Sequence, residues 1–140
     1  MLGALTGGPN MKRIFYAVLG LFFSVSTAAA DPLYGLWKTI PDDNGNFGHI
    51  KVQDCDGTIC GVLVKSFDAD GKSVESDSIG KRIIWNMKPK GDGKYGGGKI
   101  WAPDRDKTYA SKLELKGDML KVSGCVFVIC RDGGTWMRVK

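Results

Sequence analysis

Short runs of alternating apolar and polar residues, separated by glycine-rich turns, fill the chain after residue 30. Successive side chains of a strand point to opposite faces, so this period of two predicts strands with one buried face. Helical spacing is absent, apart from one turn of helix expected near residues 74–80. The pattern predicts eight strands, over residues 34–40, 48–54, 59–67, 82–87, 99–102, 107–115, 119–125 and 135–139.

Turn-forming residues separate these strands. Asp56-Gly57 and Lys116-Gly117-Asp118 are compact turn sequences, and Pro103–Asp106 is a four-residue turn with proline at a favoured position. Short turns between one-sided strands are typical of antiparallel sheets. We therefore expect an all-β fold, an eight-stranded antiparallel up-and-down barrel.

The alternation also predicts which side chains point inward. In the strand 107–115, Tyr109, Ser111, Leu113 and Leu115 share one face. An eight-stranded barrel has an interior just wide enough for side chains or for one small ligand. The candidate ligand-binding residues of the barrel interior are Val62, Val64, Tyr109, Leu113, Val122 and Met137.

The first 30 residues have the pattern of a secretory signal peptide. Met11-Lys12-Arg13 is basic, residues 14–25 are apolar, and Ala28-Ala29-Ala30 ends the segment with small residues. The apolar run is shorter than the about 20 residues of a membrane span, which disfavours the alternative of an uncleaved anchor. We expect cleavage after Ala30, a single domain over residues 31–140, and a periplasmic or secreted protein. Residues 1–10 fit neither part, so Met11 is an alternative expected start of translation.

Four cysteines follow the predicted leader, at positions 55, 60, 125 and 130. An even number of cysteines in a small exported domain indicates disulfides. Both pairs are separated by four residues, unlike the two-residue spacing typical of zinc knuckles and redox pairs. We expect the local pairs Cys55–Cys60 and Cys125–Cys130, with crossed pairing as the alternative.

The hairpin around Asp56-Gly57 makes the first pair testable. If Val52 lies opposite Val62, the apolar faces of both strands match, but Cys55 then lies opposite Ile59 instead of Cys60. A local disulfide in that register requires a β-bulge.

Composition and motifs disfavour catalysis and cofactor binding. The formal net charge is +5, but the basic residues are scattered instead of clustered, so no nucleic-acid partner is expected. His49 is the only histidine, and no motif supplies a nucleophile for it, so we interpret it as a solvent-facing side chain. The aspartates lie in turns without the spacing of a metal-binding loop. No metal, cofactor or catalytic residue is expected.

Gly35-Leu36-Trp37 and Arg138 resemble structural residues of lipocalins. In that family a G-x-W motif opens the first strand, and an arginine on the last strand packs over the tryptophan ring. The resemblance implies a calycin-like barrel whose closure depends on Gly35, Trp37, Trp136 and Arg138.

A second resemblance covers nearly all of residues 31–140. Gly96–Ile100 with Trp101, Pro103 and Asp104, then Lys107-Thr108-Tyr109, Leu120–Gly124 and Thr135–Val139, are similar to the signature of the bacterial family DUF2147. Ala102 and Asp106 depart from its usual residues within a turn. The family resembles calycins and has no established activity, so the resemblance implies a fold but no catalytic residues.

Three functional hypotheses follow. The first is an exported, non-catalytic binding protein with a small apolar or amphipathic ligand in a lipocalin-like barrel. The second is an envelope protein-interaction or stress module that acts through a surface loop, for which we single out residues 85–95 with Lys88, Lys90 and Lys94. An enzyme is the third and the least supported, because no catalytic constellation is visible.

Overall fold

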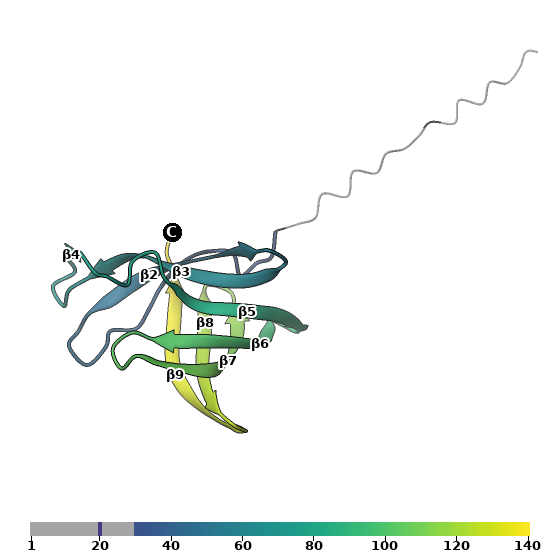
Figure 1. The fold of residues 1–140 in the computed structure, drawn as a ribbon. Coiled ribbons are helices and arrows are strands. Elements are labelled where there is room, and N and C mark those ends of the chain that lie inside the picture. Colours follow the sequence, from purple (N-terminus) through teal and green to yellow (C-terminus); the bar gives the residue numbers. More distant parts are fainter. Residues whose placement is uncertain (1–19, 21–29) are drawn as a thin grey trace, which may run out of the picture.

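The structure, a computed structural model, describes Gly20 and residues 30–140, and its described part is built from strands (Figure 1). Most of the expected leader therefore lies outside the described residues. The strands are β1 (Gly35–Lys38), β2 (Phe47–Cys55), β3 (Thr58–Phe67), β4 (Ser73–Val74), β5 (Arg82–Gly91), β6 (Lys94–Ala102), β7 (Lys107–Lys116), β8 (Met119–Val126) and β9 (Ile129–Arg138).

Eight of these strands close into an antiparallel barrel, which confirms the expected fold. Each pairs with its neighbours in the chain, and β1 closes the ring by pairing with both β2 and β9. The short β4 pairs only with β3, so it lies at an edge outside the ring. In Figure 1 the strands of opposite walls cross steeply, as the strand tilt of a small barrel requires.

Three strands extend further than the alternation predicts. β5 continues to Gly91, β6 already begins at Lys94, and β9 begins at Ile129 instead of residue 135. The added segments are rich in glycine and polar residues, which weaken a strand signal in the sequence. Their pairing partners keep them extended. Residues 77–80 form turns, so the expected helical turn is absent there.

The two ends of the barrel differ in their connections. At one end, which we call the closed end, three tight turns join β2 to β3, β5 to β6 and β7 to β8. Asp56, Asp92 and Gly117 adopt positive φ angles of 57°, 57° and 60° in these turns, as two-residue hairpin turns demand. At the other end, the open end, longer connections join β1 to β2, β3 to β5 and β6 to β7, and only β8–β9 has a tight turn.

The inward faces of the strands form one apolar core. Its largest fully buried member is Trp37, with no exposed surface. Burial of such side chains is the main favourable contribution to folding of a domain of this size. The core comprises Leu33, Trp37, Ile50, Val52, Ile59, Leu63, Ile83, Ile84, Met87, Tyr95, Leu113, Leu120, Val122 and Trp136.

The register between β2 and β3 differs from the expected one. Val52 lies opposite Gly61 and Ile50 opposite Leu63, so the inward face of β3 carries Ile59, Gly61 and Leu63. Val62 and Val64 consequently belong to the outer wall, where Val62 is half-buried and Val64 is 41% exposed. Their assignment to the interior was wrong, because the sequence pattern favoured valine over glycine as an inward residue.

Both cysteine pairs form local disulfides, Cys55–Cys60 and Cys125–Cys130. Cys125 and Cys130 lie directly opposite each other on β8 and β9. Cys55 lies opposite Thr58, and Cys60 opposite Gln53, so the first bond joins diagonal neighbours. The bulge of this hairpin lies at His49/Ile50, away from the cysteines, which corrects the expected position of the irregularity.

Candidate functional site

The closed end is sealed by the segment that precedes β1. Leu33 is fully buried, and its carbonyl accepts a hydrogen bond from the Trp37 indole Nε1 at 2.9 Å. The Asp31 carboxylate accepts a hydrogen bond from the Tyr95 hydroxyl at 2.6 Å. Burial, and then this hydrogen bond, raise the pKa of Tyr95, so the phenol stays protonated.

Arg138 lies across this seal. Its guanidinium carbon stands 4.4 Å from the centre of the Trp37 ring, and its Nη2 and Nη1 donate to the carbonyls of Pro32 and Tyr34 at 2.8 and 3.1 Å. A Cβ at Gly35 would come within 3.0 Å of Nη1, so glycine leaves room for the guanidinium. Trp136 is 4% exposed in the core beside it. These contacts close one end of the barrel.

Exposed apolar side chains gather at the open end. Among the described residues, seven of the ten large hydrophobic side chains that are exposed lie in its connections or strand ends. Phe127 and Val128, in the β8–β9 turn, are 95% and 93% exposed. We call residues 126–129 the hairpin tip, and Figure 1 shows this hairpin extending past the rest of the barrel. The remaining three of the seven are Ile40, Val74 and Ile79.

Half-buried aromatic and aliphatic side chains lie between these exposed residues and the core. Ile100 and Tyr109 are cross-strand partners on β6 and β7, and Ile100 and Trp101 pack against the core. The indole Nε1 of Trp101 donates to the Asp106 carboxylate at 2.8 Å. A hydrogen bond with Tyr109, and then the charge of Asp104, raise the pKa of Arg105, whose Nε lies 3.7 Å from the Asp104 carboxylate. The open end thus combines apolar surface with a cationic group.

The candidate ligand-binding residues are divided among three environments. Leu113 and Val122 are 2% and 1% exposed within the core, and Tyr109 is half-buried toward the open end. Val62 and Val64 are on the outer wall. Met137 is 46% exposed, directly opposite Met119 on the outer wall near the closed end, so its interior assignment was wrong. The preceding residue, Trp136, points into the core, so Met137 points to the outer wall.

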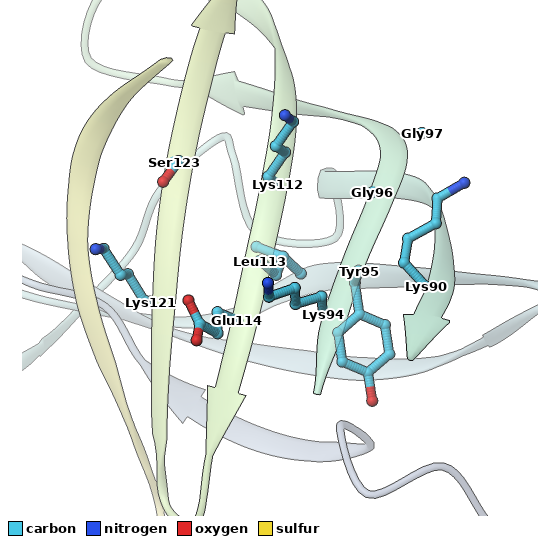
Figure 2. Close-up of a pocket in the computed structure, with 10 residues that line it drawn as sticks. All are labelled: Lys90, Lys94, Tyr95, Gly96, Gly97, Lys112, Leu113, Glu114, Lys121 and Ser123. Atoms are coloured by element: carbon cyan, nitrogen blue, oxygen red, sulfur yellow. The ribbon is translucent and has the colours of Figure 1, made fainter. Parts of the chain in front are cut away.

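A pocket of about 460 Å³ is hollowed into the outer wall where β5, β6, β7 and β8 run side by side (Figure 2). It carries four ammonium groups and one carboxylate, from side chains on all four strands. Two of these lysines, Lys90 and Lys94, belong to the segment 85–95 that the sequence predicts as a surface loop. The segment instead lies within the β5–β6 hairpin, so the prediction of a loop was wrong. The lining residues are Lys90, Lys94, Tyr95, Gly96, Gly97, Lys112, Leu113, Glu114, Lys121 and Ser123.

His49 lies on the outer wall, with its ring centre 4.6 Å from that of Phe67. Partial burial, and then the charges of Lys65 and Lys38, lower its pKa. The neutral imidazole is therefore the major form at pH 7. Across residues 30–140, no group of three or more histidine, cysteine, aspartate or glutamate side chains is arranged to hold a metal ion. The same part of the chain contains no helix long and apolar enough to cross a membrane.

Comparison with known proteins supports the architecture. No curated protein sequence matches the chain. A solved structure of the protein HP1028 from the human pathogen Helicobacter pylori, described as belonging to the lipocalin family, is similar with a TM-score of 0.60 and 16% identity. The alignment covers 80% of this chain and 85% of that chain, and at this identity it shows the fold alone. The family model described as "Uncharacterized protein conserved in bacteria (DUF2147)" matches residues 35–138. The chain therefore belongs to the DUF2147 family and folds as a lipocalin-like barrel.

Proposed function

We propose that this protein is an exported, non-catalytic binding protein that takes a small apolar or amphipathic ligand at the open end of its barrel. The observation that carries the proposal is the gathering of exposed apolar side chains at this end, while the opposite end is sealed around Trp37. Exposed apolar clusters of this kind commonly mark interaction sites. The two disulfides, the bacterial family and the leader-like sequence support export to the periplasm or beyond.

The ligand is expected at the mouth rather than deep in the barrel. Leu113 and Val122 already belong to the packed core, so a deep ligand would have to displace buried side chains. Tyr109, Ile100 and Trp101 are only half-buried and offer aromatic and aliphatic surface. Arg105 beside Tyr109 suits an anionic head group, which favours an amphipathic molecule such as a fatty acid.

Titration with a dansyl-labelled fatty acid tests this proposal. Tyr109→Ala should weaken binding by at least fivefold, because it removes the aromatic surface of the mouth. Met137→Ala is the matched control, since it removes exposed apolar surface near the closed end. Circular dichroism establishes that both variants are folded. Absence of uptake by the native protein, or equal losses in both variants, would refute binding at the mouth.

A second candidate function is attachment to a protein partner through the hairpin tip. Phe127 and Val128 are almost fully exposed at the end of the β8–β9 hairpin, which extends past the rest of the barrel (Figure 1), and such a convex tip is shaped to enter a groove rather than to enclose a small molecule. A photoreactive benzoylphenylalanine at position 127 should form one dominant adduct in cells, whereas the same group at position 137 should form none. Identical adduct patterns from both positions would count against a docking role for the tip.

A further inference from the structure

We propose that the outer-wall pocket is a second binding site, for a compact molecule that bears two or more phosphate groups. This site is independent of the open end, because it lies on the outer wall of β5–β8 rather than at the mouth (Figure 2). The pocket holds Lys90, Lys94, Lys112 and Lys121 around a floor of glycine and buried side chains. We call these four residues the lysine ring.

Alternation along β7 and β8 brings the lysine ring together. Leu113 and Val122 point into the core, so Lys112 and Lys121 point outward from the same wall. Lys94 pairs with Glu114 across β6 and β7, and Glu114 pairs with Lys121 across β7 and β8. Four consecutive strands, β5 to β8, thus each contribute a lysine to the lining of the pocket.

A bulge in β6 produces the hollow between these lysines. The pairing of β6 with β7 shifts between Tyr95 and Gly98, and Gly97 has a φ of +77°. A bulge leaves an extra residue without a ladder partner and bends its strand. Gly96 and Gly97 contribute no side chains, and the side chain of Lys90 lies over both of them. A Cβ at Gly97 would lie 3.8 Å from the Lys90 ammonium, which places that charge over the hollow.

The ammonium groups of the ring have no carboxylate partner among the described residues. The ion pairs of residues 30–140 are Arg105–Asp104, Lys116–Glu114, Arg138–Asp118 and Lys140–Asp118. Glu114, the one acid that lines the pocket, is thus directed to Lys116 at 3.6 Å. Lysines elsewhere on the barrel, such as Lys38 and Lys81, lie over aromatic rings. The four ammonium groups of the lysine ring therefore remain available to an anionic ligand.

Phosphate groups suit this charge better than a single carboxylate does. A phosphate monoester carries close to two negative charges, and lysine ammonium groups bind it as point charges. The volume of about 460 Å³ lies within the range of small-molecule pockets and admits a phosphorylated molecule about the size of a sugar. Because the site is open to solvent, binding should weaken steeply as the salt concentration rises.

Titration of isotopically labelled protein with inorganic pyrophosphate, followed by nuclear magnetic resonance, tests the site. The amides of Gly96, Gly97 and Lys112 should shift most. The double variant Lys112→Gln/Lys121→Gln should lose at least tenfold in affinity. The control Lys51→Gln/Lys72→Gln, which removes the same charge from exposed positions elsewhere, should lose less than twofold. Glu114→Gln should bind more tightly, because it removes the only acid that lines the pocket.

A second arm distinguishes a soluble ligand from a lipid head group. Vesicles of phosphatidylglycerol and of phosphatidylcholine are sedimented with native protein and with both double variants. Pyrophosphate binding without vesicle binding assigns a soluble ligand, and vesicle binding that needs the lysine ring assigns a lipid phosphate. Equal losses in the two double variants, shifts spread over all lysines, or no binding to either probe would overturn the proposal. Tyr109→Ala should leave pyrophosphate binding unchanged, because Tyr109 lies at the open end. A failure of the proposed ligand site there therefore does not refute the outer-wall site.

Discussion

Gly61 lies on the inward face of β3, where its missing side chain leaves room for Ile50 and Ile84 to pack against the backbone. A Cβ at this position would stand 2.7 Å from Cγ2 of Ile50 and 2.8 Å from Cγ1 of Ile84, closer than real Cβ contacts. Both isoleucines are almost completely buried and have little room to move. We expect Gly61→Ala to lower the free energy of unfolding by about 1–3 kcal/mol, as overpacking of a core does. Urea denaturation measures the change.

Gly96→Ala is the matched control for that substitution. Its φ angle is not positive, and the nearest atom to a Cβ there would be Cε of Lys90 at 3.6 Å, an ordinary contact. We expect its free energy of unfolding to stay within about 0.5 kcal/mol of the native value. A cost at Gly96 equal to that at Gly61 would show that glycine flexibility matters here rather than close packing.

His49 should make stability depend on pH in the mildly acidic range. Its pKa in the folded barrel lies below the ordinary 6.5, so the unfolded chain takes up the proton first as the pH falls. Stability is therefore fully present above pH 6.5 and decreases as the pH falls through the folded pKa. His49 is the only histidine of the chain, so His49→Gln should abolish the difference between thermal midpoints at pH 7 and pH 5. A variant that keeps the full difference would contradict this assignment.

The β8–β9 hairpin places bulky apolar residues where turn formation favours glycine. Phe127 has a φ of 56°, while Val128 is outside the positive-φ region. Glycine is the preferred residue at the first position of such a two-residue turn, and a larger side chain there costs about 1–2 kcal/mol. The Cys125–Cys130 disulfide directly behind the turn holds the two strands together. The exposed apolar tip offers a contact surface.

Phe127→Gly should therefore raise stability while removing the apolar tip. We expect the free energy of unfolding to increase by up to about 1 kcal/mol, after the greater flexibility of glycine in the unfolded chain is counted. Chemical denaturation with the disulfide intact gives the value. Val64→Gly, at an exposed apolar position in the middle of β3, should instead lower stability. A loss of stability in both variants would show that the φ of Phe127 carries no strain.

Strand patterns in this chain were readable because polar and apolar residues alternate and Asp-Gly pairs mark the turns. The eight barrel strands and the inward face of β7 were predicted in this way. The inward face of β3 was not predicted, because one of its inward residues is Gly61, and Val62 and Val64 on the opposite face gave the stronger apolar signal. The lysine ring was also missed, since its members become neighbours only through the pairing of β6 with β7 and of β7 with β8.

Closure of the whole barrel depends on its shortest strand. β1 contributes two residue pairs to β9, Trp37 with Arg138 and Lys38 with Met137, whereas β7 and β8 share seven pairs. The β1–β9 seam is supplemented by the hydrogen bond from the amide of Val139 to the carbonyl of Leu36 at 2.8 Å and by the guanidinium contacts of Arg138. Side-chain contacts therefore compensate for a short backbone ladder at the point where the ring closes.

Arg138→Ala should open this seam before the rest of the barrel. Loss of the charged hydrogen bonds and of the contact with Trp37 should lower the free energy of unfolding by about 2 kcal/mol. Hydrogen exchange should accelerate first at the amides of β1 and the end of β9, while those of β7 and β8 keep their protection. Arg131→Ala removes an exposed arginine from the same strand and should change neither measurement. Uniform acceleration in all strands would instead mean that the barrel opens only by global unfolding, with no weak seam between β1 and β9.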